Sequence, residues 1–207
     1  MSTLKVDTIL KRTGTGTITV GQSGDTIALP SATLTTALPV ASGGTGGTSF
    51  SAAGLSNTPA FEVVRNGNQT LTNNTVTKIN FDSEQFDSDN AYDNSTNYRF
   101  TVPSEKAGKY YVYLKAGIEG ASNSNFQYGS LRIRKNGTDI REEWIDARSG
   151  GLRFITLSLN TTLDLAVGDY LEAYAYGNLS SGDPDIKADR GSGMKISVFG
   201  GYRILGA

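Results

Sequence analysis

The sequence predicts an all-β protein in which a folded head follows a leader that cannot fold alone. Short segments of alternating apolar and polar residues recur between turns rich in Gly, Asn and Asp, and no window shows the period of an amphipathic helix. Of residues 1–58, 29 are Thr, Ser or Gly, and Phe50 is their single aromatic residue. Residues 59–207 hold the other 18 of the 19 aromatic side chains, so only they can build a sizeable core.

The leader divides into a strand-forming segment at 1–29 and a linker at 30–58. Within the first, residues 4–10, 15–20 and 26–29 favour short strands, each bounded by Gly or Pro. Three such strands with so few apolar residues are marginal in isolation, so we expect them to pair with sister chains or to pack on a larger partner. The linker contains Pro30, Pro39 and the run GGTGG at 43–47, a composition with little to bury.

The head at 59–207 contains about eight to ten short strands, which favour an antiparallel sandwich. The segment 86–98 is rich in Asp and Asn and is predicted to be a long surface excursion. Asn136-Gly137 is a strong signal for a hairpin turn. Strands are predicted at 61–64, 76–81, 108–117, 131–135, around Trp144 and Ile145, at 152–159, 170–176 and 194–205.

Composition excludes several classes of function. The chain has no Cys and no His, which removes disulfides, thiolate chemistry and every catalytic triad built on histidine. A net charge of −1 gives no sustained basic excess for nucleic acid, and no apolar run is long enough to insert in a membrane. The first residues lack the apolar core of a secretory signal. We therefore expect a protein that is not an enzyme and needs no cofactor.

Five segments of the head resemble, in order, the globular heads of the complement/TNF-like family. They are Phe61 with NFD at 80–82, GKYYV at 108–112, IRKNG at 133–137, LAVGDYL at 165–171 and FGGYRIL at 199–205. This resemblance covers about residues 59–207 and implies a ten-stranded antiparallel jelly roll that assembles as a homotrimer.

The leader resembles a different group of proteins. The runs MSTLKVDTI at 1–9 and LPVASGGTG at 38–46 are similar to the N-terminal and linker regions of bacteriophage tail-fibre proteins, cyanophage fibres in particular. This implies a location on the virion, at the tail or on the capsid surface, with contacts to other virion proteins through the N-terminus. The residues expected to attach the chain there are Leu4, Val6, Ile9 and Leu10.

The head is unusually rich in tyrosine on a small set of strands. Successive strand residues face opposite sides, so Tyr110 and Tyr111 cannot both face one core. Packing between sheets within one chain explains some of these rings, and contact with neighbouring chains in a threefold ring explains the rest. The predicted trimer interface comprises Tyr111, Tyr113, Tyr174, Tyr176, Phe199 and Tyr202.

Two groups of charged residues raise the question of ligand sites. Acidic residues gather on predicted loops at Asp82, Glu84, Asp87, Asp89 and Asp93, and again at Asp183 and Asp185. A calcium site or a contact with a host glycan would use such residues, although an ordinary solvated loop is the favoured interpretation and the spacing does not match an EF-hand. The basic residues Arg132, Arg134, Lys135, Arg141, Arg148 and Arg153 alternate with acids, which favours cross-strand ion pairs over an anion- or lipopolysaccharide-binding patch.

These expectations combine into one leading hypothesis and two alternatives. The leading hypothesis is a phage tail fibre or fibre tip, attached through its N-terminus, whose trimeric head recognises a glycan or protein on the host cell surface. The first alternative is a capsid decoration or capsid fibre protein with no receptor role. The second, less favoured, is a glycan depolymerase, because acidic residues are so frequent that a carboxylate pair can always be drawn.

Overall fold

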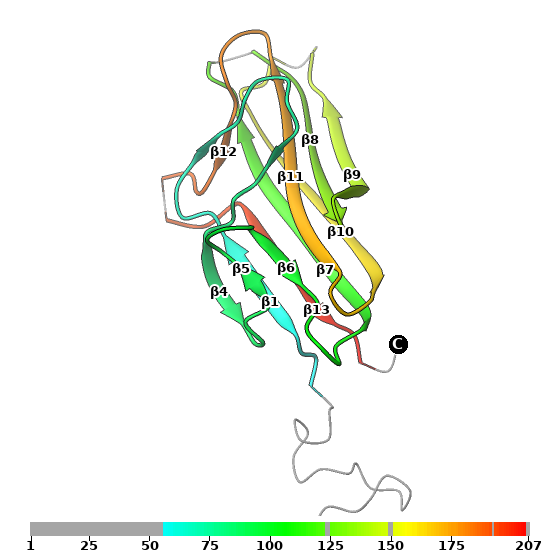
Figure 1. The fold of residues 1–207 in the computed structure, drawn as a ribbon. Helices are drawn as coiled ribbons and strands as arrows, with labels where there is room; N and C mark the ends of the chain where they lie inside the picture. Colours follow the sequence, from blue (N-terminus) through cyan, green and yellow to red (C-terminus); the bar gives the residue numbers. More distant parts are fainter. Residues whose placement is uncertain (1–55, 123–124, 149–150, 192, 206–207) are drawn as a thin grey trace, which may run out of the picture. The chain divides into compact units, whose positions relative to one another are not determined.

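The computed structural model describes residues 56–122, 125–148, 151–191 and 193–205. The segment 1–29, most of the linker and the attachment residues Leu4, Val6, Ile9 and Leu10 therefore lie outside the described residues. Within the described part the chain forms thirteen strands and no helix. The all-β prediction is confirmed for that part (Figure 1).

The strands form two sheets in which every pairing is antiparallel. The β7 sheet is built on the central strand β7 (Gly108–Glu119). Its other members are β2 (Gln69–Thr70), β12 (Asp185–Lys187), β13 (Val198–Arg203), β1 (Ala60–Val64), β4 (Ser83–Asp87) and β10 (Phe154–Leu165).

The β11 sheet is built on β11 (Tyr170–Leu179) and packs face to face against the β7 sheet (Figure 1). Its order is β5 (Tyr92–Asp93), β6 (Arg99–Thr101), β11, β8 (Phe126–Lys135) and β9 (Thr138–Asp146), and β3 (Thr77–Lys78) also pairs with β11. The antiparallel two-sheet sandwich is thus confirmed. Three of the thirteen strands are only two residues long, and the predicted count of ten strands is not confirmed.

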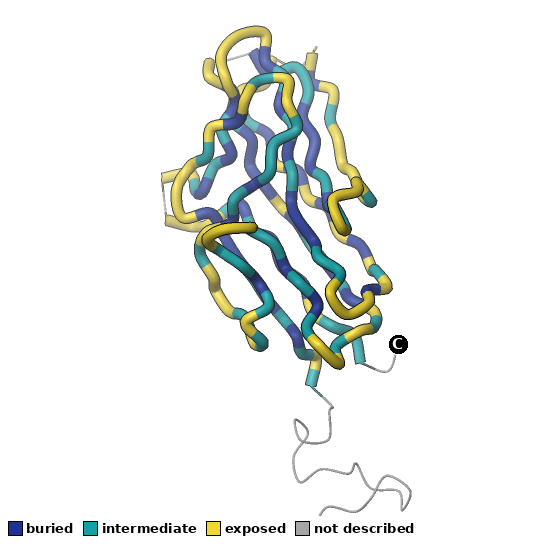
Figure 2. Tube along the Cα trace, viewed as in Figure 1, coloured by how far each residue is buried: buried dark blue, intermediate teal, exposed yellow. Residues whose placement is uncertain are grey.

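The core lies between the two sheets and follows the alternation of each strand. Along β7, Tyr110, Val112 and Leu114 are buried, whereas Tyr111 and Tyr113 face outward, as the period of two requires. Buried and partly buried positions alternate along the strands in Figure 2. Aromatic rings from both sheets meet at the centre. Phe61 of β1 stacks on Phe100 of β6 with ring centroids 4.5 Å apart.

One sequence expectation changes in the core. The segment 86–98 was expected to be a surface excursion, but it contains β5, and Tyr92 on this strand is only 5% exposed. Tyr92 contacts the rings of Phe61 and Phe199 at centroid distances of 5.6 and 6.3 Å. The polar residues around Tyr92 concealed this inward-facing ring, since alternation over two residues is too short to detect.

Candidate functional site

The candidate site lies on the outer face of the β11 sheet, where β8 runs between β11 and β9. Ser130 of β8 is paired with Tyr176 of β11 on one side and with Trp144 of β9 on the other. These three residues form a cross-strand row, with a small side chain between two aromatic ones. The next row along the same face, two residues on, is Tyr174, Arg132 and Glu142.

A β-bulge determines that Trp144 faces outward. From the Asn136-Gly137 turn, β8 and β9 pair regularly as far as Arg134 and Asp139, and then the register shifts by one residue. Ile140 is the extra residue. Because a shift of one residue moves side chains to the opposite face, this bulge places Trp144 beside Ser130 on the outer face.

The row opens into a groove of about 340 Å³. Trp144 and Tyr176 border it, and Ser130 lies at its base. Tyr128 closes one end, and the Arg132–Glu142 pair closes the other. The volume falls within the usual range for small-molecule sites, and the lining combines aromatic surface with a few polar groups, as such sites usually do.

Trp144 is the most unusual residue of the groove. It is the only tryptophan in the chain, and 63% of its side chain is exposed. Large aromatic side chains carry a great deal of apolar surface and are strongly enriched where proteins bind ligands or partners. The cost of leaving this ring in water suggests a binding role rather than a role in the fold.

Ser130 gives the base of the groove an unsatisfied polar atom. The residue is 3% exposed, and its Oγ has no hydrogen-bond partner among the described residues. A buried hydroxyl without a partner carries a desolvation cost of about 1–3 kcal/mol. A bound group that hydrogen-bonds Oγ would recover that cost.

Tyr176 forms a fixed wall of the groove. Its hydroxyl donates a hydrogen bond of 2.6 Å to Asn74 Oδ1, which holds the ring in one orientation. Tyr176 was predicted to belong to the trimer interface. The structure shows that it borders this groove, and its role in a trimer stays a prediction. Its neighbour Tyr174 also faces outward on the β11 sheet, where the Arg134 guanidinium lies 3.9 Å from the ring centroid.

The basic residues around the groove are paired with acids. Arg132 donates from Nε to Glu142 Oε1 and from Nη1 to Asp139 Oδ2, both at 2.9 Å. Arg134 also donates to Asp139, and this hydrogen bond lowers the pKa of the Asp139 carboxyl. The cross-strand interpretation is therefore confirmed at these residues.

Other members of the basic set lie elsewhere on the head. Lys135 pairs with Asp169 at 2.7 Å, Arg148 with Asp146 at 2.5 Å and Arg153 with Glu119 at 3.4 Å, and Arg141 donates to Thr161 Oγ1. These residues contact different partners, so they do not form a shared anion-binding patch.

The remaining residues of the predicted trimer interface occupy two separate places. Tyr111, Tyr113 and Tyr202 lie together on the outer face of the β7 sheet, with ring centroids 6.2 and 5.6 Å from Tyr111. The Tyr113 hydroxyl donates 2.6 Å to Glu62 Oε2, and burial is the main cause that raises the pKa of Tyr113. Phe199 does not belong with them, because it is 0% exposed and packs inside its own chain, leaving no surface for a neighbour.

The acidic residues of the loops act as acceptors within the fold. Asp93 is the clearest case: its carboxylate accepts hydrogen bonds from the backbone N–H groups of Ser95, Thr96 and Asn97. These bonds, led by those from Thr96 and Ser95, lower its pKa. Asp93 therefore holds a turn together.

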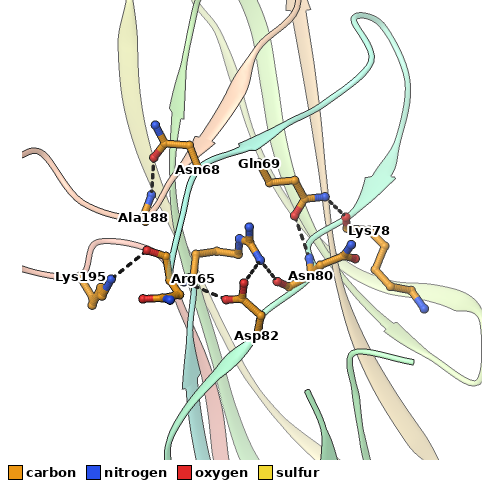
Figure 3. Close-up of polar contacts among 9 residues, drawn as sticks. Arg65, Asn68, Gln69, Lys78, Asn80, Asp82, Ala188 and Lys195 are labelled. Atoms are coloured by element: carbon orange, nitrogen blue, oxygen red, sulfur yellow. Dashed lines mark hydrogen bonds and ion pairs between the residues drawn. The ribbon is translucent and has the colours of Figure 1, made fainter. Parts of the chain in front are cut away.

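Asp82, just before β4, has a comparable role. It forms an ion pair of 2.8 Å with Arg65, which also donates to the Asn80 carbonyl (Figure 3). The contact joins the end of β1 to the segment before β4. Arg65 is only 8% exposed, so its side of the ion pair is shielded from water.

The other predicted ligand residues are dispersed in the same way. Asp87 accepts from the Tyr92 backbone, Asp89 lies near Lys106, Asp183 accepts from the Asn73 backbone, Asp185 accepts from Thr70, and Glu84 is exposed on β4. Across the described ranges, no three acidic residues come together in a way that could hold a metal ion. The calcium alternative therefore has no geometric support there, and the glycan contact at these loops stays a prediction.

Comparisons with known proteins give only distant likenesses. No family model matches the chain, and no curated protein matches it. The globular domain of the zebrafish complement 1qA protein is 18% identical over 71% of this chain and 98% of that one, with a TM-score of 0.49. The TNF Eiger from S. frugiperda is 12% identical over 72% and 93% of the two chains, with a TM-score of 0.48.

Both of these structures are of the complement or TNF kind that the head segments resemble, and neither comes from a phage. The all-β assignment itself rests on the two sheets of the head. None of the described residues forms a helix long and apolar enough to cross a membrane.

Proposed function

We propose that this chain is a non-catalytic structural protein of a phage virion, whose head recognises the host cell surface. The observation that carries the proposal is the exposed Trp144 at the border of a groove with an unsatisfied polar base. Such a groove fits a binding site better than an inert surface. The leader, by its composition and its resemblance to fibre proteins, would attach the chain to the virion.

The arrangement of the head supports attachment at one end and binding at a distance from it. Arg203 N donates to Pro59 O at 3.0 Å, so the first and last described strands meet at one end of the sandwich (Figure 1). At the other end, Gly120 N donates to Arg153 O, and β8 begins close by. The groove is lined by Tyr128, Ser130 and Arg132, at the middle of β8, and so lies away from the end where β1 begins.

A homotrimer is part of the proposal. A threefold ring uses two different patches on each chain, because every interface is heterologous. The rings of Tyr111, Tyr113 and Tyr202 provide one candidate patch on the outer face of the β7 sheet. Tyrosine suits such a contact, since it combines apolar surface with a hydroxyl that can stay hydrogen-bonded.

The trimer can be tested by sedimentation of the full chain. We expect a trimer for the unmodified protein and dissociation for Tyr111→Asp, because the substitution would bury a charge without a partner. Val167→Asp, at a residue 52% exposed in the turn between β10 and β11, is the matched control and should leave the assembly intact. A monomer at micromolar concentration for the unmodified chain would contradict the proposal.

Host recognition can be tested by binding of the labelled full-length protein to whole cells. We expect saturable binding to a susceptible strain and none to a resistant derivative. Trp144→Ala should abolish binding, whereas Phe86→Ala, which removes a different exposed ring, should not. Equal binding to both strains, or equal loss in both variants, would count against a receptor role for the groove.

A capsid decoration protein remains the second candidate, because a leader that attaches to the shell would have the same composition. Copy number separates the two. A few copies per particle at one vertex favour a tail fibre, and many copies over the shell favour decoration.

A further inference from the structure

We propose that the groove binds a single uncharged sugar ring, which enters edge-on between Trp144 and Tyr176 and hydrogen-bonds Ser130 Oγ. This inference rests on the proposed function, since it names the chemistry that the head would recognise on a cell surface. Three features of the groove support it: the spacing of the strands that carry Trp144 and Tyr176, the Ser130 hydroxyl without a partner, and the ion pairs that already neutralise Arg132.

The width follows from the strand register. Trp144 and Tyr176 lie on the two strands that flank β8, both opposite Ser130. Neighbouring strands are about 4.8 Å apart, so the two backbones are separated by about 9.6 Å. A ring in van der Waals contact with an aromatic wall on each side needs about 7–8 Å, twice the usual carbon–carbon contact distance. The register therefore places the two aromatic side chains two strand spacings apart, which is compatible with one ring between them.

The chemistry at the base selects a ring that carries hydroxyl groups. Ser130 Oγ can both donate and accept a hydrogen bond, yet it does neither with any described residue. A sugar presents apolar C–H faces to the aromatic walls and hydroxyls at its edge. Ser130 Oγ is covered in the free protein, so a sugar hydroxyl can bond to it only after a neighbouring side chain moves. Trp144 has the freedom to move aside for this, because 63% of its side chain is in solvent, whereas Tyr176 is held by Asn74.

The charges at the Arg132–Glu142 end of the groove favour an uncharged ligand. Arg132 is the cation that lines the groove, and it already donates to Glu142 and to Asp139. The charge of Arg132 is already balanced by these two carboxylates, so an acidic sugar would gain little from it and would meet the negative charges of Glu142 and Asp139, a cost that a neutral hydroxyl avoids. Both Arg132–Glu142 contacts use Oε1 of Glu142, which leaves Oε2 as an acceptor for a ligand hydroxyl.

The inference can be tested by titrating the full-length protein with neutral methyl pyranosides and watching its fluorescence. Trp144 is the only tryptophan, so the signal reports on this groove alone. We expect at least one neutral pyranoside to shift the emission saturably in the millimolar range, with no change in affinity when salt is raised. Glucuronic acid is the charged comparison and should bind more weakly than the matching neutral sugar.

Variants distinguish the groove from the rest of the surface, with affinities measured by calorimetry. Ser130→Ala should weaken binding about 2- to 10-fold, the value of one neutral hydrogen bond. Because Ser130 Oγ has no partner in the free protein, this change should not destabilise the fold, so weaker binding reports a lost ligand contact. Trp144→Ala should abolish binding, and Phe86→Ala should preserve it.

Three results of the sugar titrations would overturn the inference: no pyranoside response, tighter binding of the acidic sugar, or unchanged affinity in Ser130→Ala. If Trp144→Ala abolishes cell binding but no sugar binds, the groove recognises another ligand, such as a host protein, and the proposed function survives. If sugars bind but cells do not, the groove is a sugar site and the host-recognition proposal fails. A second copy of the chain could also cover Trp144. Its emission would then shift with protein concentration and not with sugar concentration, and this result would also overturn the inference.

Discussion

Replacing Gly201 by alanine should destabilise the head, because β13 packs closely against β7 at this residue. Gly201 is buried and is paired with Val112 on β7 and with Phe61 on β1. A Cβ atom at this position would lie 2.8 Å from the backbone carbonyl oxygen of Tyr111 and 3.4 Å from both Phe61 Cε1 and Val112 Cα. Backbone in the middle of a sheet cannot turn aside as a side chain can, so β13 must shift.

The expected cost follows from this overlap. Extra atoms in a well-packed core usually cost about 1–3 kcal/mol. In a protein of this size each kcal/mol lowers the melting temperature by about 2–4 °C, so we expect a fall of about 2–12 °C. Gly200→Ala provides a contrast, because its Cβ would meet the hydroxyl end of the Tyr113 side chain, which can move at the cost of its hydrogen bond to Glu62.

Thermal unfolding followed by far-ultraviolet circular dichroism measures this difference. All variants should be compared at one protein concentration, because assembly would make the melting temperature depend on concentration. Gly67→Ala is the matched control, since its Cβ would have no neighbour within 4 Å. A Gly201→Ala variant that melts within 1 °C of the unmodified protein, or a Gly67→Ala variant that loses as much stability as Gly201→Ala, would show that close packing at Gly201 does not limit stability.

Two further predictions concern charged groups. The pKa of Asp169 is lowered from 3.8 to about 2, mainly by the hydrogen bond from Lys135, so its contribution to stability is present above pH 4 and disappears as the pH falls towards 2. Asp169→Asn should therefore lose less stability than the unmodified protein between pH 4 and pH 2, as thermal unfolding at each pH would show. Arg65→Met should cost about 1–3 kcal/mol in urea unfolding, since it removes a buried contact with Asp82 and Asn80; a cost below 0.5 kcal/mol would contradict this role.

Much of the head could be predicted from the sequence because its long strands alternate clearly. The segment 108–117 has apolar residues at every second position, and the structure shows this segment within β7. The Asn136-Gly137 turn was predicted from two residues, and both adopt the positive φ values, 52° and 80°, that such a turn needs. Here local chemistry and the fold favour the same structure.

The short elements could not be predicted, because tertiary contacts determine them. β5 is two residues long, and its sequence indicates only a polar loop. Tyr92 enters the core because Asp93 closes the turn that follows and Asp87 accepts a hydrogen bond from the Tyr92 backbone. These acids accept hydrogen bonds from backbone N–H groups, and every residue except proline offers such a group. The sequence therefore does not show whether an acid holds a turn or binds a ligand.

The candidate site depends on a single residue that no sequence pattern identifies. If β8 and β9 kept the register that they have at the Asn136-Gly137 turn, Trp144 would be opposite Gly129, whose missing Cβ points at the core residues Ile155 and Phe126. The bulge at Ile140 moves Trp144 one position along, to Ser130 and the outer face. Polar residues on both faces of 138–146 give no signal for either register. The exposure of Trp144 therefore results from a bulge in the edge strand β9. Bulges often redirect side chains at binding sites. The register shift is thus an independent reason to assign a function to this groove.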